Sequence, residues 1–251
     1  MSFFTSLGNF VRSFSFDFVP GEETNFEDSI GGSWYISPEA HGIEFLTLVP
    51  FYLGMTYYYG NKILFKDKTN YKLLTQDMKN RPAKSWLELL CLITMTASYA
   101  VTVIHKYITS TEFFLLQPCH ASALLLVMVM AWPDKANPFI PQLLFNIYIH
   151  TLWGSVLALV FPDLRDHEII GEIFNFFLEH TLILVLPFYL VFTKRYVVLP
   201  FSKNMGLFSY FLYAAYHSPL LHVVSLWSGY NINYTLVPPA RKCFSFLFFF
   251  F

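Results

Sequence analysis

The sequence predicts an all-α protein, a polytopic bundle of transmembrane helices. Of the 251 residues, 55% are hydrophobic and 20% aromatic, and the mean hydropathy is +0.46. Only 13% are charged, about half the share found in soluble domains. Too few charges are therefore available to cover a surface that faces water. In addition, the apolar residues fall into six runs that are long enough to cross the hydrocarbon core of a bilayer.

Each of the first three runs has residues that indicate a membrane interface, a helix start or a helix kink. Residues 41–59 contain Pro50 and end in three consecutive tyrosines, which favour the membrane interface. Residues 86–107 follow Lys84 and Ser85 and begin with a tryptophan. Residues 113–132 contain Pro118, and proline can open a helix but does not comfortably continue one. We therefore expect Pro118 either to begin the third helix or to kink it.

The last three runs complete the six expected spans. Residues 139–161 are followed by a polar loop, residues 172–192 contain His180 and Pro187, and residues 206–227 contain two histidines. Beyond residue 239 comes an apolar run of eight residues, which is too short to span. We therefore expect a lumenal N-terminal tail (1–40), a transmembrane helical domain (41–239) and an aberrant or truncated C-terminal tail (240–251). This tail is either the stub of a seventh helix or an unrelated C-terminus.

The lysine and arginine residues predict the orientation. If the loop between the first two helices is cytoplasmic, eleven of the sixteen basic residues lie inside and five outside. The N-terminus and the glycosylation sequon Asn233-Tyr234-Thr235 then lie on the lumenal or extracellular side. Arg12 and Asp17 interrupt the N-terminal apolar stretch, so no cleaved signal peptide is expected.

Composition and motifs argue against several classes of protein. A net charge of -1 leaves no basic surplus for nucleic acid. The three cysteines lie far apart, which disfavours a disulfide framework or a zinc ribbon. The histidines are scattered singly, unlike the His boxes of di-iron desaturases, and no Cys/His/Asp set is close enough in sequence for zinc. We therefore expect no metal or other cofactor; no oligomeric state is predicted.

The third and fifth helices carry the main candidate site. Ionisable and reactive groups are costly inside a membrane, so their presence requires a reason. In the expected topology, Cys119 and His180 lie roughly 9 and 12 Å below the lumenal end of their helices, at about 1.5 Å per residue. An imidazole that reaches a thiol can take its proton. Two interpretations remain open: a Cys–His pair for nucleophilic catalysis, or a structural cysteine and a histidine in a buried hydrogen bond.

The neighbouring polar residues are weaker candidates. Adjacent residues on a helix point about 100° apart, so His120 is a poorer partner for Cys119 than His180. Glu179 is expected to face another polar group, and Asn175 to line the same cavity as His180. On the sixth helix, His217 either forms an interhelical hydrogen bond or contributes to a site. The candidate catalytic residues are Cys119 and His180, and the candidate substrate-binding residues are His120, Asn175 and His217.

The same stretches resemble the transmembrane protein 164 family. The matching segments are LQPCH at 116–120, LALVFP at 157–162, EHT at 179–181 with PFYL at 187–190, FLYAAYH at 211–217 and NINY at 231–234. The first is the family's N/Q-P-C-H signature. The resemblance covers about residues 86–239, and the N-terminal third agrees mainly in hydropathy. Family members usually continue past the Asn-rich loop into a further helix, whereas this chain continues into residues 240–251.

The resemblance implies a phospholipid acyltransferase. Such an enzyme moves a polyunsaturated acyl chain from a phospholipid onto an ether lysophospholipid, so membrane lipids are the implied substrates and the endoplasmic reticulum or Golgi membrane the implied location. The family's proposed nucleophile and base correspond to Cys119 and His180. No acyl-CoA site is visible, which favours lipid-to-lipid transfer. The alternative is a non-enzymatic transporter or lipid-binding receptor that uses the same polar cavity.

Overall fold

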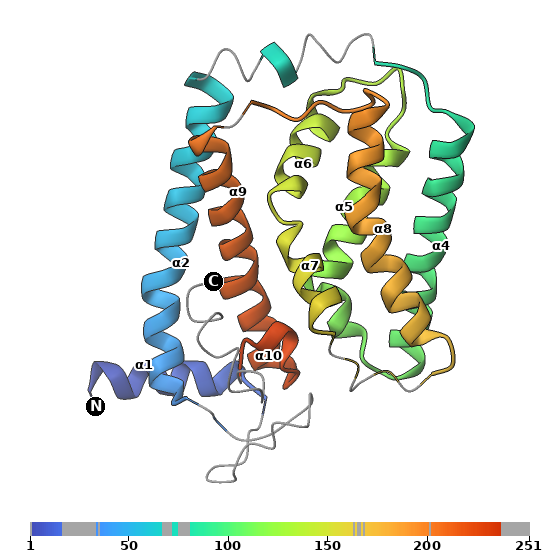
Figure 1. Ribbon diagram of the computed structural model, residues 1–251. Coiled ribbons are helices and arrows are strands. Elements are labelled where there is room, and N and C mark those ends of the chain that lie inside the picture. Colours follow the sequence, from blue (N-terminus) through green and yellow to red (C-terminus); the bar gives the residue numbers. More distant parts are fainter. Residues whose placement is uncertain are drawn as a thin grey trace. The chain divides into compact units, whose positions relative to one another are not determined.

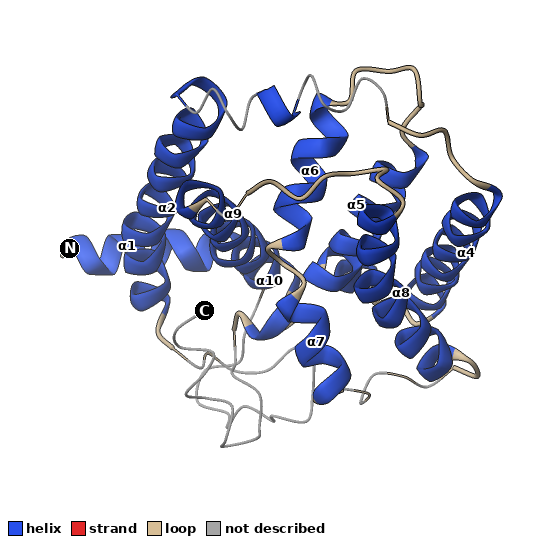
Figure 2. Cartoon of the chain, turned by 45° about the horizontal axis from the view of Figure 1, so that its top comes forward, coloured by secondary structure: helices blue, strands red, loops and turns tan. Residues whose placement is uncertain are grey.

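The protein is helical throughout the part of the chain that the structure describes. The computed structural model describes residues 2–16, 34, 36–66, 72–74, 81–162, 164, 167, 169–200 and 202–236 (Figure 1). Figure 2 shows helices and loops but no strand among these residues. The predicted all-α class is therefore confirmed. The predicted C-terminal tail after residue 240 lies outside the described residues.

The chain forms two compact units. The first comprises Met1–Met55 and Phe211–Phe251, and the second comprises Thr56–Tyr210. In chain order the elements are α1 (Phe3–Phe14), α2 (Pro38–Asn61), the π-helical turn η1 (Lys62–Lys66), α4 (Trp86–Ile108), the 3₁₀ turn η2 (Glu112–Leu116), α5 (Pro118–Ala131), α6 (Phe139–Ile149), α7 (Trp153–Val160), α8 (Glu172–Phe192), α9 (Lys203–Ala215), the π-helical turn η3 (Tyr216–Leu221), α10 (His222–Ser228) and η4 (Ile232–Tyr234).

Two helices of the second unit are long and apolar enough to cross a membrane. These are α4 and α8, and their ends agree with the predicted ranges to within one residue. Helices α6 and α7 form a third candidate span if the pair is counted as one, and α5 is a shorter apolar helix. Large apolar side chains point outward from α4 and α8, including Ile93, Phe174 and Phe188 at 57%, 72% and 71% exposure. Such exposed apolar faces are stable against lipid and costly against water.

The predicted third helix begins at its proline. A 3₁₀ turn covers Glu112–Leu116, and α5 then starts with Pro118 at its first position after Gln117. Proline is suited to this position because the N–H that it lacks would have no partner there. Of the two positions expected for Pro118, the structure shows the helix start rather than a kink.

The predicted continuous helix over residues 139–161 is wrong in detail. The structure has two helices, α6 and α7, that meet at an angle of 43°. At the break the backbone changes to i→i−3 hydrogen bonds, from His150 to Ile147 and from Thr151 to Tyr148. The Thr151 hydroxyl also donates to the Tyr148 carbonyl at 2.8 Å. A hydroxyl that competes for a main-chain carbonyl is a known cause of helix bending.

Helix α1 was not expected from the sequence, which placed residues 1–40 in a tail. It begins after Ser2, whose hydroxyl accepts a hydrogen bond from the Thr5 N–H at 3.2 Å. This is the common N-cap arrangement, and it satisfies one of the free donors of the first turn. Val11 from α1 and Leu226 from α10 are fully buried together in a small core of the first unit.

The core of the second unit lies between α4, α5, α6 and α8, and Figure 1 shows α4, α5 and α8 side by side. Its buried members are Met95, Ala123, Leu126, Val129, Met130, Phe145, Tyr148, Ile183, Leu186, Leu190 and Tyr196. Tyr148 is buried without an unsatisfied hydroxyl, because its O–H donates to the Ile183 carbonyl at 2.6 Å. This contact and the packing of the apolar side chains fix α6 against α8.

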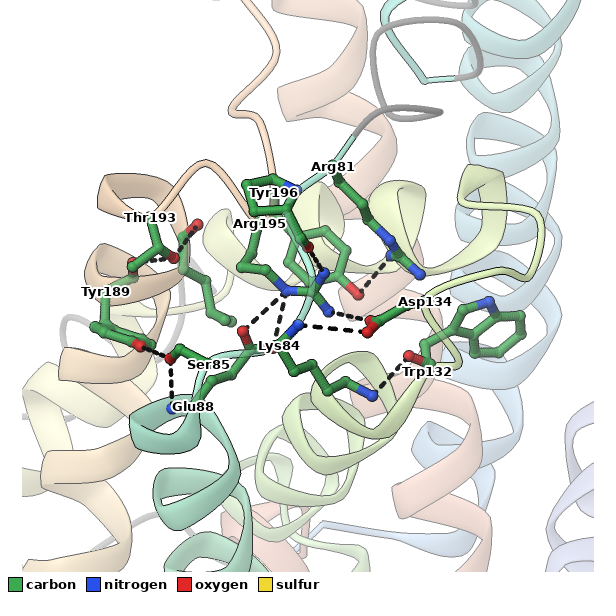
Figure 3. Close-up of polar contacts among 12 residues, drawn as sticks. Arg81, Lys84, Ser85, Glu88, Trp132, Asp134, Tyr189, Thr193, Arg195 and Tyr196 are labelled. Atoms are coloured by element: carbon green, nitrogen blue, oxygen red, sulfur yellow. Dashed lines mark hydrogen bonds and ion pairs between the residues drawn. The ribbon is translucent and has the colours of Figure 1, made fainter.

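A buried arginine joins three segments of the second unit at one end of these helices (Figure 3). Arg195, which follows α8, is 1% exposed, and its Nε lies 2.9 Å from an oxygen of Glu88 on α4, which is equally buried. Its other two nitrogens donate to Asp134 Oδ1 at 2.8 Å and to the Pro82 carbonyl. A buried guanidinium needs such partners to offset the loss of water. This Arg195 cluster therefore fixes the loops before α4, after α5 and after α8.

Asp134 is the most accessible member of this cluster. Burial would raise the pKa of its carboxyl, but hydrogen bonds from the Lys84 N–H and the Arg195 guanidinium outweigh burial, and the pKa is lowered. A group with a lowered pKa in the folded state contributes stability above its ordinary pKa. That contribution is lost as the pH falls through the lowered pKa.

Gly229 provides the first testable prediction. It ends α10 with a φ of +79°, and an added Cβ would lie 2.8 Å from a ring carbon of Phe16. We expect Gly229→Ala to lower the free energy of unfolding by about 1–2 kcal/mol from the left-handed backbone alone. Thermal unfolding in detergent measures this loss. Gly154→Ala in α7 is the control, because an added Cβ there has no heavy atom within 4 Å; equal stability of the two variants would contradict the prediction.

Candidate active site

Cys119 is the second residue of α5 and has a free, partly buried thiol. The first main-chain hydrogen bond of this turn runs from the Ala121 N–H to the Gln117 carbonyl at 3.0 Å. Donors in the first turn of a helix have no partner within the helix. The N–H groups of Cys119 and His120 belong to this first turn and precede that hydrogen bond along the chain. The start of α5 thus places two main-chain donors beside the thiol, where they can stabilise negative charge.

A buried imidazole–carboxylate contact joins the start of α5 to α8. His120 Nδ1 lies 2.8 Å from Oε1 of Glu179, and the two residues are 8% and 1% exposed. The other carboxylate oxygen of Glu179 accepts a hydrogen bond from the Thr102 hydroxyl of α4 at 2.7 Å. A buried carboxylate is tolerated only with such donors. Glu179 therefore connects α4, α5 and α8 through its two oxygens.

Asn175 lies one turn before Glu179 on the same face of α8. Its Oδ1 accepts from the Ser98 hydroxyl at 2.8 Å, and its Nδ2 donates to the Ser98 carbonyl at 3.1 Å and to the Thr102 hydroxyl at 2.8 Å. Both amide hydrogens are thus used in pairing α8 with α4. A bound lipid would have to use the remaining lone pair of Oδ1. The substrate-binding role of Asn175 stays a prediction.

An ion pair extends this polar contact to the end of α4. Lys106 Nζ lies 3.2 Å from Oε1 of Glu172, the first residue of α8, and both side chains are buried. The pairing of α4 with α8 was not predicted from the sequence, although the spacing of their polar residues contains a signal for it. The polar residues recur every third or fourth position on two otherwise apolar helices, which places them on one face of each. They are Ser98, Thr102 and Lys106 on α4, and Glu172, Asn175 and Glu179 on α8.

His180 has one nitrogen bound and the other free. It is 1% exposed, its ring packs on Phe176 at 4.2 Å between centroids, and its Nδ1 lies 2.8 Å from the Phe176 carbonyl. Because a carbonyl only accepts, Nδ1 carries the hydrogen and Nε2 carries the lone pair. Within the described part of the chain, Nε2 is buried and has no hydrogen-bond partner. A buried acceptor without a partner is costly, and the lone pair of this nitrogen is available to a donor that reaches it.

The structure brings most of the predicted site residues onto two packed helices. Cys119 and His120 lie at the start of α5, and Asn175 and His180 lie on α8, which packs against α5. No hydrogen bond joins Cys119 to His180 in the described chain. The prediction that Glu179 faces a polar group is confirmed, and the group is His120.

His217 lies in the first unit, in the π-helical turn η3, with its ring stacked near that of Tyr213 at 6.1 Å between centroids. The second unit holds the other four predicted site residues. The substrate-binding role of His217 therefore stays a prediction, as does its association with Cys119 and His180.

The polar residues on α4, α5 and α8 fall within a segment shared with a known family. The model of the TMEM164 family matches residues 35–250, which is most of the chain. The chain belongs to the TMEM164 family. The TMEM164 match starts before α2, so it extends well beyond the segments at residues 116–234 that carried the resemblance in the sequence.

One curated relative supports this membership. A protein described as "Transmembrane protein 164 homolog" from Dictyostelium discoideum is 29% identical over 216 residues, which cover 85% of this chain and 76% of the relative. No solved structure matches the chain. The TMEM164 relationship and the apolar helices together indicate a membrane protein.

Proposed function

We propose that this chain is a membrane phospholipid acyltransferase that uses Cys119 as nucleophile and His180 as general base. It would move a polyunsaturated acyl chain from a phospholipid onto an ether lysophospholipid. The observation that carries this proposal is the buried Nε2 of His180 on α8, which has no hydrogen-bond partner among the residues that the structure describes. Helix α8 packs against α5, whose first turn carries the Cys119 thiol. A thiol and an available imidazole nitrogen on packed helices are the two groups that thioester chemistry requires.

In the first half-reaction, Nε2 of His180 takes the Cys119 proton as the sulfur attacks the ester carbonyl of the donor phospholipid. The N–H groups of Cys119 and His120 then donate hydrogen bonds to the oxyanion of the tetrahedral intermediate. The ester C–O bond breaks, and His180 returns the proton to the leaving oxygen. The products are a lysophospholipid and an acyl thioester on Cys119.

In the second half-reaction, the hydroxyl of the ether lysophospholipid attacks the thioester carbonyl. His180 removes the hydroxyl proton, the C–S bond breaks, and the proton passes to the Cys119 sulfur. The enzyme regains its starting state without acyl-CoA. We assign substrate contacts to His120 and Asn175. The Glu179 carboxylate orients His120 in this scheme.

The proposed topology has six spans with a lumenal N-terminus. The spans are α2, α4, α5, the bent pair α6–α7, α8, and the broken series α9, η3 and α10. The excess of lysine and arginine in the loop between α2 and α4 supports a cytoplasmic location for that loop. Cys119 and His180 then lie toward the lumenal side of an endoplasmic reticulum or Golgi membrane.

His180 provides the test of this proposal. The purified protein is placed in vesicles that contain a polyunsaturated diacyl phospholipid and an ether lysophospholipid, without CoA, and the acylated ether lipid is measured by mass spectrometry. We expect His180→Ala to lower the initial rate about 10²–10⁴-fold, the usual contribution of a general base. His150→Ala is the control, because His150 follows α6 and only its main chain, which alanine keeps, takes part in the contacts described above.

Two outcomes would contradict the proposal. One is an equal rate for His180→Ala and His150→Ala at equal protein levels. The other is that the wild-type protein binds or transports the lipids in these vesicles but forms no acylated ether lipid. That result would favour a transporter or lipid-binding receptor.

A further inference from the structure

The first unit contains two histidines and a glutamate whose ligand atoms converge. His41 and Glu44 lie one turn apart on α2, and His222 begins α10. His222 Nε2 lies 2.7 Å from His41 Nδ1, and Glu44 Oε2 lies 3.6 Å from His41 Nδ1. One nitrogen or oxygen of each residue lies within 4.8 Å of the other two. We refer to these three residues as the His–Glu cluster.

Aromatic rings pack on the two buried histidines of the His–Glu cluster, and its glutamate is partly exposed. His41 and His222 are 2% and 5% exposed. The Trp34 ring packs on His41 at 5.6 Å, and the Phe45 ring packs on His222 at 4.8 Å. The Glu44 side chain is 42% exposed, so this member of the cluster lies at the surface. An apolar wall that limits water and an access path are both features of protein metal sites.

A hydrogen bond between the two histidines accounts for only part of this geometry. In that bond one ring nitrogen must carry a hydrogen and the other must present its lone pair. The Glu44 carboxylate is 3.6 and 3.9 Å from the nearest imidazole nitrogens, too far for a hydrogen bond to either. The bond between the rings therefore leaves unexplained why the carboxylate converges on the same point.

We propose that His41, Glu44 and His222 bind a divalent transition-metal ion, with zinc as the preferred ion. Two imidazoles and a carboxylate are a ligand set of zinc proteins, and the fourth position is left for water or another ligand. Two nitrogens on one tetrahedral zinc lie roughly 3.3 Å apart at ordinary Zn–N lengths. The rings would separate by about half an ångström from their hydrogen-bonded distance. The ring that carries the shared hydrogen would change tautomer, so that its hydrogen moves to the other ring nitrogen and the lone pair faces the metal.

This proposal differs from the expectation, made from the sequence, that the chain binds no metal. That expectation rested on the wide spacing of the histidines, and His41 and His222 are 181 positions apart. Only folding of the first unit brings them together. Bound zinc would tie α2 to α10 inside this unit. The proposal is independent of acyl transfer by Cys119, since either can fail without the other.

Metal content of the full-length protein tests the site. The protein is purified in detergent, stripped with a chelator, dialysed against zinc and then against metal-free buffer, and its zinc is measured by plasma mass spectrometry. We expect about one zinc per chain in the wild type, as for a three-ligand site. His222→Ala and Glu44→Gln are expected to lose it, and His150→Ala to keep it. Equal zinc in the wild type and His222→Ala, including none in both, would overturn the proposal.

Cobalt provides a readout that needs no variant. Wild-type protein loaded with Co²⁺ should show the intense visible absorption of four- or five-coordinate cobalt, and added zinc should abolish it. Only the weak absorption of six-coordinate aqueous cobalt would overturn the proposal. Size-exclusion chromatography identifies any variant that fails to fold, and for such a variant the cobalt spectrum of the wild type decides the question.

Discussion

Cys119→Ala is expected to abolish acyl transfer, with a loss of about 10⁴-fold or more, as when the nucleophile of a covalent catalyst is removed. Alanine cannot form the thioester, and the His180 nitrogen then has no thiol proton to accept. The substitution removes one sulfur atom at the start of α5 and leaves Pro118 and its helix start in place. The measurement is the initial rate of ether phospholipid acylation in vesicles.

Cys91→Ala is the matched control. Cys91 is the other free cysteine in the described chain, is also partly buried, and packs against the core of the second unit from α4. We expect this variant to keep most of the activity, because no proposed step uses its thiol. A Cys119→Ala protein that works at the rate of Cys91→Ala would contradict the assignment of the nucleophile.

Arg195→Ala is expected to cause a large loss of stability, about 3–5 kcal/mol, because it leaves a buried carboxylate without its partner. Glu88 is 1% exposed, and its carboxylate contacts Arg195 Nε at 2.9–3.0 Å. Lys194→Ala is the control, since Lys194 is adjacent in sequence but exposed. Thermal unfolding of the purified proteins in the same detergent gives the difference.

The double variant Glu88→Leu/Arg195→Met tests whether the unpaired Glu88 carboxylate causes this loss of stability. Removing both buried charges leaves no buried carboxylate unpaired, since Asp134 is partly exposed, so this protein should be more stable than Arg195→Ala. If the double variant and Arg195→Ala unfold at the same temperature, packing or the Asp134 and Pro82 contacts would explain the loss instead. An Arg195→Ala protein as stable as Lys194→Ala would contradict the structural role of the Arg195 cluster.

The ends of long apolar helices that are bounded by charged residues were predictable from the sequence. The ranges of α4 and α8 follow from the hydropathy, because each is a predominantly apolar run with charged residues beyond both ends. Pro118 also limited its helix to two possible positions, and the structure shows one of them. In each case a local physical rule was sufficient.

Breaks inside apolar runs were not predictable in the same way. Residues 139–161 form α6 and α7 because of local hydrogen bonds at Thr151, which hydropathy does not report. Residues 206–227 likewise contain most of α9, the π-helical turn η3 with Pro219 inside it, and most of α10. Whether a proline or threonine breaks a helix depends on which neighbours satisfy the released main-chain groups.

The candidate site was predictable at the level of helices but not of contacts. Depth along each predicted helix indicated that Cys119 could lie near His180. Helices α5 and α8 do pack, but α5 begins at Pro118 and Cys119 lies in its first turn, so the matching depth stays a prediction. The contact of His120 with Glu179 depends on the rotation of both helices about their axes, which a single sequence does not fix. The free Nε2 of His180 likewise follows from the local hydrogen bond to Phe176.

The most direct test of Cys119 as the nucleophile is detection of the acyl group on its sulfur. Wild-type protein is incubated with a polyunsaturated phospholipid donor and no acceptor, and is then denatured, digested and analysed by mass spectrometry. We predict the acyl mass on the Cys119 peptide, its release by neutral hydroxylamine, and its disappearance when ether lysophospholipid is added before denaturation. Active protein that acylates the acceptor but never carries an acyl group on Cys119 would contradict the proposed mechanism.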